Sequence, residues 1–230
     1  MNEHLIKLQN TLYERQLLQP LDILLVGSTG SGKSSTINAL FGNNQAEIGE
    51  GVAPQTLQIK EYLLRNSLRL HDSAGLGDNK KSDILHSKGI IAKLSEFCNV
   101  QGGAINYNYY LIDLVMVVFE GGKRDLGTVF SLLTEILKVI PPERVIVAIN
   151  QSDMVMKGRH WQSDLNFPDR ILQKQLLLNA ESVQRRIYES TGSKIATPIC
   201  YSARHGYNLD KLLEHIIGHL PENQRKTLKQ

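Results

Sequence analysis

The chain has 230 residues, of which 41% are hydrophobic and 21% charged, and its formal net charge is +3. This length allows one large α/β domain with a substantial core, or such a domain with a small appendage. The weak charge gives no clear signal for nucleic acid or for an anionic membrane. Two cysteines, Cys98 and Cys200, indicate neither a disulfide framework nor a zinc site. Because no apolar run is long enough to cross a bilayer and the first residues show no signal-peptide pattern, we expect a cytoplasmic protein.

The N-terminal half of the chain alternates helical and strand patterns. Leu5, Leu8 and Leu12 recur at helical spacing, and Pro20 ends that segment. The apolar run Leu21–Val26 has the length of a buried strand. In chain order we expect a helix over residues 4–18, a strand over 21–26, a helix over 35–41, a loop over 43–55, and strands over 57–64 and 67–71. The last two strands flank a short polar turn, and this pattern predicts a β-hairpin.

The C-terminal half continues the alternation. In order, we expect a helix over 82–97, an irregular segment over 101–109, a strand over 112–119, a helix over 127–139, a strand over 144–149, a helix over 169–188, a strand over 198–201 and a helix over 209–220. Strands that are apolar on both faces and separated by helices predict a three-layer α/β fold around a mostly parallel sheet. The hairpin adds one antiparallel edge strand. The expected divisions are an N-terminal helix (1–20) packed on the domain's flank, the main domain (21–220) and a basic tail (221–230).

A phosphate-binding loop lies between the first strand and the next helix. Gly27-Ser28-Thr29-Gly30-Ser31-Gly32-Lys33-Ser34 matches the pattern G-x-x-x-x-G-K-[ST] in its required strand–turn–helix context. The glycines let backbone N–H groups point at a polyphosphate, and the helix N-terminus adds partial positive charge. A lysine at the seventh position supplies a point charge for the β- and γ-phosphates, and the hydroxyl after it can bind Mg²⁺. The predicted phosphate-binding residues are Gly27, Gly30, Ser31, Gly32, Lys33, Ser34 and Ser35.

Three further polar segments each follow a predicted strand. Asp72 begins Asp72-Ser73-Ala74-Gly75, whose carboxylate can reach Mg²⁺ through water and whose glycine N–H can contact a γ-phosphate. Asn150-Gln151-Ser152-Asp153 ends in a carboxylate able to accept from both N1–H and the exocyclic amine of guanine, which adenine does not offer. Ser202-Ala203 places a small residue where its N–H can approach the guanine O6. Since ligands bind beyond the carboxyl ends of parallel strands, all of these segments should meet on one rim.

In this order, the four segments resemble the signature boxes of Era-like P-loop GTPases, the TrmE-Era-EngA-Septin-like branch, and more closely their bacterial, often prophage-encoded members. The resemblance covers roughly Leu21 to Leu220 and implies the P-loop NTPase fold of small GTPases. It implies GTP and GDP as ligands and Mg²⁺ as the cofactor. By position, it implies Ser34, Thr56 and Asp72 as metal residues, Thr56 and Gly75 as switch residues, and Asn150, Asp153, Ser202 and Ala203 as the guanine pocket.

Three positions depart from better-studied relatives. Gln151 stands where lysine is usual, so it can cover the purine but brings no charge, and we expect weaker nucleotide affinity. Leu76 stands where a glutamine would orient the attacking water, which predicts slow intrinsic hydrolysis unless Gln55, Asp78 or a partner positions the water. Gly30 has no side-chain oxygen for a potassium ion, so we expect no potassium activation by that route.

The residues therefore predict a GTP-binding molecular switch with slow Mg²⁺-dependent hydrolysis. Two alternatives stay open: a nucleotide-dependent interaction module with negligible turnover, which Leu76 favours, and an ATPase or small-molecule kinase, which Gln151 leaves possible. The expected partners are GTP or GDP, an unidentified protein effector or activator, and a second copy of the chain. Trp161 could be a lid over the nucleotide, a partner contact or an anchor for its loop, with the anchor preferred.

Overall fold

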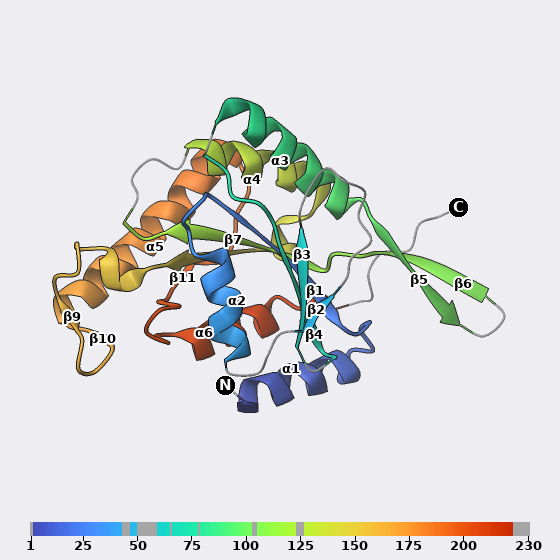
Figure 1. Ribbon diagram of the computed structural model, residues 1–230, viewed down its shortest axis with the longest axis horizontal. Helices are drawn as coiled ribbons and strands as arrows, with labels where there is room; N and C mark the ends of the chain where they lie inside the picture. Colours follow the sequence, from blue (N-terminus) through green and yellow to red (C-terminus); the bar gives the residue numbers. More distant parts are fainter. Residues whose placement is uncertain are drawn as a thin grey trace.

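The computed structural model describes residues 2–42, 47–49, 59–64, 66–77, 79–102, 105–122 and 127–222. Within these ranges, one seven-stranded sheet has the order β11-β8-β7-β1-β4-β3-β2. Its strands are β1 (Leu21–Gly27), β2 (Glu47–Gly49), β3 (Lys60–Leu64), β4 (Leu68–Asp72), β7 (Leu114–Glu120), β8 (Val145–Asn150) and β11 (Ile199–Cys200). Figure 1 shows this sheet crossing the molecule between two groups of helices.

The sheet is parallel except for one strand. β11, β8, β7, β1 and β4 pair in parallel, whereas β3 pairs antiparallel with β4 on one side and with β2 on the other. The predicted fold and its hairpin are confirmed, but β2 lies outside β3 and forms the sheet edge. The expectation of a loop throughout 43–55 is therefore wrong at residues 47–49, because three residues pair through their backbone and carry no readable side-chain pattern.

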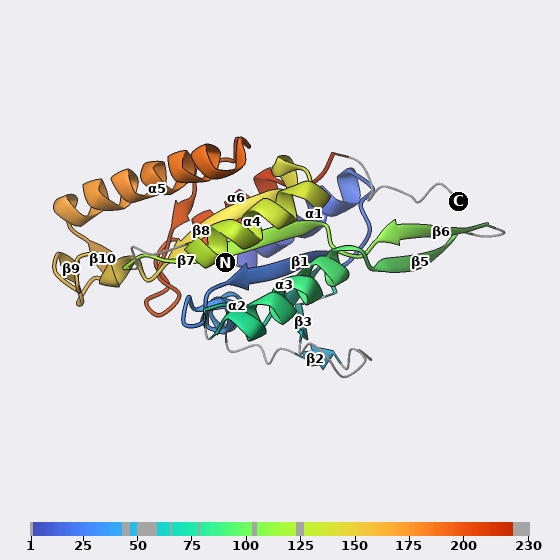
Figure 2. The same cartoon turned by 90° about the horizontal axis from the view of Figure 1, so that it is seen from above.

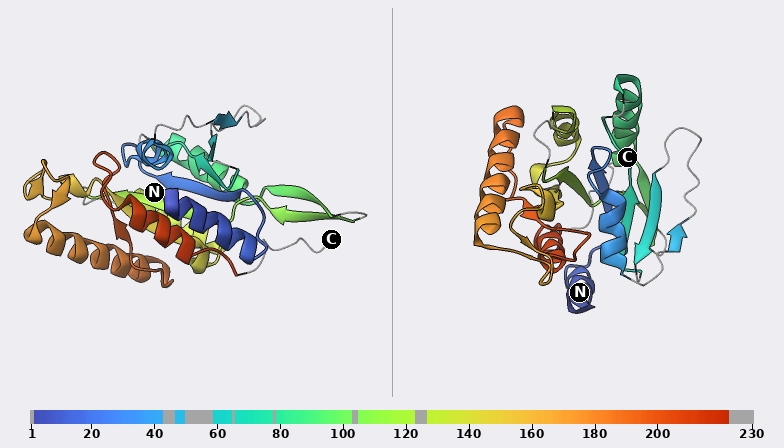
Figure 3. Two further views of the ribbon diagram at one scale, coloured as in Figure 1. Left: turned by 90° about the horizontal axis from the view of Figure 1, so that it is seen from below. Right: turned by 60° about the vertical axis from the view of Figure 1, so that its left-hand side comes forward.

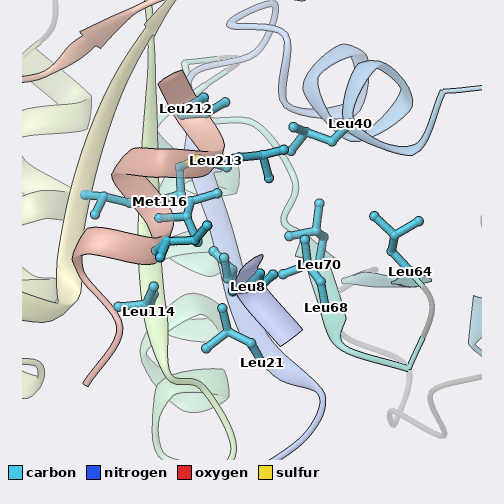
Figure 4. Packing of buried hydrophobic residues seen from close by; sticks show 14 of the residues in the cluster. Leu8, Leu21, Leu40, Leu64, Leu68, Leu70, Leu114, Met116, Leu212 and Leu213 are labelled. Atoms are coloured by element: carbon cyan, nitrogen blue, oxygen red, sulfur yellow. The ribbon is translucent and has the colours of Figure 1, made fainter. Parts of the chain in front are cut away.

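Two apolar cores lie on opposite faces of the sheet. On one face, α1 (Asn2–Glu14), α2 (Lys33–Phe41) and α6 (Leu209–Gly218) pack leucines from each helix against the sheet, as Figure 4 shows for Leu8, Leu40 and Leu213. On the other face lie α3 (Lys80–Leu94), α4 (Gly127–Val139) and α5 (Arg170–Thr191). Removing this apolar surface from water on both faces is the main stabilising term of a three-layer fold.

The N-terminal helix is part of this packing. α1 lies beside α6, as the left-hand view of Figure 3 shows, and Leu5, Leu8 and Leu12 are buried in the same core as β1. The expected packing on the domain's flank is therefore what the structure has.

No helix in the described part of the chain is long and apolar enough to span a membrane.

Two hairpins were not anticipated from the sequence. β5 (Phe97–Gly102) pairs antiparallel with β6 (Ile105–Tyr110), so the prediction of an irregular segment over 101–109 is wrong. The predicted helix 82–97 ends early at Leu94, which releases the residues that form β5. A shorter hairpin joins β9 (Trp161–Gln162) to β10 (Phe167–Pro168) before α5. Figures 1 and 2 place the two hairpins at opposite ends of the molecule.

The short elements complete the chain. The 3-10 turn η1 (Pro142–Arg144) leads into β8, and η2 (Ser152–Met154) follows it directly. Because β1, β4, β8 and β11 run in parallel, their carboxyl ends at Gly27, Asp72, Asn150 and Cys200 open onto one rim of the sheet. The predicted motif segments all begin at this rim.

Candidate functional site

The loop between β1 and α2 is shaped by glycine. Gly32 has a φ of 87°, and a Cβ at this position would lie 2.1 Å from Asn150 Nδ2, so a side chain is excluded on both grounds. The loop is closed by Ser31 N–H donating to Ser28 O at 3.1 Å, and α2 begins directly after it at Lys33. The predicted strand–turn–helix context of the phosphate loop is therefore present.

The Lys33 ammonium curls back over the loop. Its Nζ donates to Gly27 O and Ser28 O, both at 3.2 Å, and the residue is 7% exposed. A cation held by carbonyl oxygens at the mouth of a helix N-terminus is a positive centre to which polyphosphate is attracted.

The hydroxyl of Ser34 and the carboxylate of Asp72 face each other. Ser34 Oγ donates to Asp72 Oδ2 at 2.7 Å, while Asp72 Oδ1 is buried without a hydrogen-bond partner among the described residues. Hydroxyl and carboxylate oxygens are the donors that Mg²⁺ prefers, and a buried carboxylate oxygen with spare acceptor capacity suits a hydrated cation. The residues present therefore fit Mg²⁺. Thr56, the third predicted metal residue and a predicted switch residue, lies outside the described residues.

The segment after Asp72 is attached to the phosphate loop through its backbone. Thr29 N–H donates to Leu76 O at 2.7 Å, and Leu76 N–H donates to Gly27 O at 3.2 Å. A Cβ on Gly75 would lie 2.7 Å from Thr29 N, so the segment approaches the loop more closely than any other residue type would allow. The predicted switch glycine is thus beside the phosphate loop.

Leu76 points away from this rim. It is 1% exposed and packs in the core with Val26 and Ile90. Its side chain therefore does not face the phosphate side of the site. Gln55 and Asp78, the predicted candidates for orienting water, lie outside the described residues.

Asn150 joins the two halves of the site. Its Nδ2 donates to Ser31 O at 3.1 Å, and its Oδ1 accepts from Ala203 N–H at 3.0 Å. The residue is 2% exposed, so both amide ends of a buried side chain are satisfied. This one side chain fixes the phosphate loop relative to the segment after β11.

Asp153 is held next to that segment. Ser202 Oγ donates to Asp153 Oδ1 at 2.7 Å, and both residues are buried. A carboxylate has about four acceptor positions, so one hydrogen bond leaves capacity for a ligand. The carboxylate still borders the cavity, which is where the guanine prediction requires it.

Gln151 makes a contact that the sequence did not suggest. Its backbone is left-handed, with a φ of 60°, and its Nε2 donates to Gly30 O at 2.8 Å. The amide therefore braces the phosphate loop by a hydrogen bond, without the charge that the usual lysine would bring. Only the position beside Asn150 could have hinted at this contact.

A cavity of about 500 Å³ lies between these groups. It is lined by Gly30, Gly32, Lys33, Ser34, Ser35, Asn150, Gln151, Asp153, Met154, Ser202, Ala203 and Arg204. The volume suits a small-molecule ligand. Most predicted phosphate and guanine residues meet here, while Gly27, Ser31, Asp72 and Gly75 lie outside the lining. Met154 and Arg204 were not predicted.

Trp161 lies beside the cavity region rather than in its lining. Its ring centroid is 5.1 Å from that of His205 and 5.6 Å from that of Tyr207. Phe167, on the facing strand of the same hairpin, also contacts Tyr207 edge-on at 5.4 Å. These contacts favour the anchor interpretation of Trp161, because aromatic packing ties the β9–β10 hairpin to the segment after β11.

Comparison with known proteins places this geometry in a family. A family model described as "50S ribosome-binding GTPase" matches residues 22–151. The tRNA modification GTPase MnmE of Sulfurovum sp. (strain NBC37-1) is 25% identical over 160 residues, which cover 68% of this chain and 32% of MnmE. MnmE of Francisella philomiragia is 38% identical over 86 residues, covering 35% and 18% of the two chains. The chain thus spans about a third of the length of the first of these relatives.

Solved structures share the fold. Era in complex with MgGDPNP and 16S ribosomal RNA superposes with a TM-score of 0.51 at 22% identity, covering 93% of this chain and 60% of Era. Toc33 from Arabidopsis thaliana in complex with Mg²⁺ and GMPPNP gives a TM-score of 0.62 at 12% identity, covering 99% and 95%. At these identities the likeness extends to the arrangement of sheet and helices.

Proposed function

The chain belongs to the 50S ribosome-binding GTPase family, among the Era- and TrmE-like P-loop GTPases, and from this we propose that it is a GTP-binding switch with slow Mg²⁺-dependent hydrolysis. The observation that carries the proposal is the double hydrogen bond of Asn150, which fixes the phosphate loop and the segment at Ala203 around one cavity. A triphosphate with a purine has the shape that such a two-ended site accepts.

Guanine recognition is proposed for the end at Asp153. A carboxylate there accepts from guanine N1–H and from the exocyclic amine, and adenine would leave it unpaired at a desolvation cost. Ser202 Oγ donates to the carboxylate at 2.7 Å, and Ala203 is small enough for a base to approach its backbone N–H. Since the Ala203 N–H already donates to Asn150, a base O6 would share that donor.

Phosphate binding is proposed for the other end. Lys33 Nζ would exchange its contacts with Gly27 O and Ser28 O for phosphate oxygens, which are stronger acceptors. The N–H groups at the start of α2 add partial positive charge. Ser34 and Asp72 would hold Mg²⁺, with Thr56 proposed to complete the set. When bound, Mg²⁺ neutralises charge on the β- and γ-phosphates.

Switching and slow turnover are proposed from the segment after β4. The Gly75 N–H is proposed to contact a γ-phosphate, and loss of that phosphate would release the segment from the phosphate loop. Hydrolysis would proceed by in-line attack of water, with Lys33 and the loop N–H groups stabilising the developing charge. Turnover is proposed to be slow because Leu76 is buried in the core and orients no water.

That burial also favours the alternative of an interaction module that binds GTP and hardly hydrolyses it. Titration with GTP, GDP and ATP in the presence and absence of Mg²⁺ tests the guanine claim, and tighter binding of ATP than of GTP would refute it. A single-turnover assay with the bound GTP complex then separates the two candidates. Measurable GTP cleavage supports the switch, while a stable complex without cleavage supports the module.

The proposed partners are GTP or GDP, a protein effector or activator, and a second copy of the chain, in the cytoplasm. Ile84 and Leu85 support a protein partner, because they lie on α3 close to the switch segment and are 57% and 59% exposed. Capture experiments with protein loaded with a GTP analogue or with GDP, together with light scattering of both forms, test these partners. Identical capture and identical mass in both states would contradict nucleotide-dependent switching.

A further inference from the structure

His205 approaches the carboxylate of Asp153 by two routes. Its backbone N–H donates to Ser202 Oγ at 3.3 Å, and that hydroxyl in turn donates to Asp153 Oδ1 at 2.7 Å. Its ring Nε2 lies 3.7 Å from the other carboxylate oxygen, Asp153 Oδ2, within ion-pair distance. The Asp153 side chain is only 7% exposed, so protein groups rather than water orient its two oxygens.

The ring of His205 is itself held by the β9–β10 hairpin. Its Nδ1 donates to Asn166 Oδ1 at 2.8 Å, and Asn166 sits in the turn of that hairpin with a φ of 48°. Trp161 packs against the ring, with centroids 5.1 Å apart and the ring planes tilted by 45°. A histidine fixed on one nitrogen and on one face has little rotational freedom, so its second nitrogen keeps a constant direction.

We propose that His205 is a positioning residue for guanine recognition, and that the β9–β10 hairpin sets the orientation of Asp153 through Asn166 and His205. This inference rests on the proposed function. Guanine presents N1–H and its exocyclic amine side by side, and a carboxylate accepts both only when its plane lies in the plane of the base. Ser202 donates to one oxygen, and the imidazolium form of His205, which carries a hydrogen on each ring nitrogen, pairs with the other oxygen through Nε2. His205 does not contact the nucleotide in this proposal.

The test compares affinity for GDP with affinity for inosine diphosphate, which lacks the exocyclic amine. The dissociation constant for inosine diphosphate divided by that for GDP reports how well the carboxylate accepts from that amine. His205→Asn keeps a donor at the Nδ1 position but is too short to reach Asp153, and we expect the ratio to fall about tenfold. His205→Gln places an N–H at the Nε2 position, and we expect it to keep the ratio within about threefold of wild type.

A control histidine lies outside the hairpin. His4, on α1, lies 3.3 Å from the carboxylate of Glu214 on α6, so His4→Ala should leave the ratio unchanged. A role of His205 in folding alone would lower the melting temperature without moving the ratio. An unchanged ratio in His205→Asn overturns the inference. Should that variant not fold, an unchanged ratio in Asn166→Ala overturns it.

These results are distinguishable from failure of the proposed function. If the wild-type chain binds no GDP, or binds GDP and inosine diphosphate equally, then the guanine-reading role of Asp153 fails. If the wild type prefers GDP and the His205 and Asn166 variants show the same preference, the proposed function stands and this inference alone is refuted.

Discussion

The two halves of the rim are held together in different ways. On the base side, buried side chains form the contacts: Asn150 bonds to Ser31 O and to Ala203 N–H, and Ser202 bonds to Asp153. On the switch side, the contacts are mainly between backbone groups, because the segment at Leu76 pairs with the phosphate loop through N–H and C=O groups. The Ser34–Asp72 contact is a side-chain link on this side.

This difference separates two functions. Buried side chains whose hydrogen bonds are all made keep one geometry, since breaking any of these bonds leaves a buried polar group without a partner. The base side should therefore bind the base of GTP and of GDP alike. Backbone pairing across a glycine is more easily exchanged for contacts with a ligand. The switch side should therefore carry the distinction between the two nucleotides.

The largest expected effect is that of Lys33→Ala, which removes the ammonium group proposed to contact the phosphates of both GTP and GDP. We expect GTP and GDP affinity to fall together by roughly 1,000-fold, because charge-assisted hydrogen bonds to two phosphates are lost. Isothermal titration measures this loss. The control is Lys138→Ala, an exposed lysine on α4 that pairs with Glu135. A loss of affinity confined to GTP would mean that Lys33 distinguishes the two nucleotides, which would contradict the division of the rim into a base side and a switch side.

Asp153→Asn tests the base side directly. GDP affinity should fall roughly 100-fold, while affinity for xanthosine diphosphate rises, since the new amide donates to the xanthine O2. Competition between the two diphosphates measures the change. Asp164→Asn, at an exposed position in the β9–β10 turn, is the matched control. Equal affinity of the variant for both diphosphates would contradict the guanine-reading role.

Leu76→Gln tests whether this position belongs to the core or to the catalytic rim. Burying an amide without partners should lower the free energy of unfolding by about 2 kcal/mol and leave GTP hydrolysis no faster. Thermal melting and a single-turnover assay measure the two quantities. Leu85→Gln, on the exposed face of α3, should change neither. Faster hydrolysis in Leu76→Gln would show that the side chain reaches the phosphates after all.

Much of this arrangement was predictable from the sequence. The alternation of apolar strands with helices fixes a parallel sheet, and the parallel sheet alone brings Gly27, Asp72, Asn150 and the segment after Cys200 to one rim. The convergence of the motifs therefore needs no knowledge of side-chain contacts.

What escaped prediction depends on contacts between distant residues. Gln151 reaches Gly30 from a left-handed backbone conformation, and Leu76 is buried in a segment that pairs with the phosphate loop. The β5–β6 hairpin was missed although its second strand carries a strand signal. Ile105, Tyr107 and Tyr109 alternate with Asn106 and Asn108, and the prediction gave more weight to the glycines and asparagines of the segment than to this alternation.

Gly75→Ala tests the switch side. A Cβ here would meet Thr29 backbone atoms at 2.6 and 2.7 Å, so the segment must move away from the phosphate loop. We expect GTP affinity to fall about tenfold relative to GDP affinity, the loss of one hydrogen bond to a charged group. Gly218→Ala, where a Cβ meets nothing within 4 Å, is the control. An equal loss for both nucleotides would remove the proposed distinction between the two sides.

The smallest effect is expected at Gln151, which links the two sides. Gln151→Lys replaces the hydrogen bond to Gly30 O with an ammonium near the phosphates, and we expect GTP and GDP to bind about threefold more tightly at low salt. Gln151→Ala loses the brace and should bind both about threefold more weakly. The two variants separate charge from bracing, because the gain in Gln151→Lys should vanish at about 1 M salt, where screening is nearly complete. A gain that persists at high salt would mean that packing over the purine, and not charge, limits affinity in the natural chain.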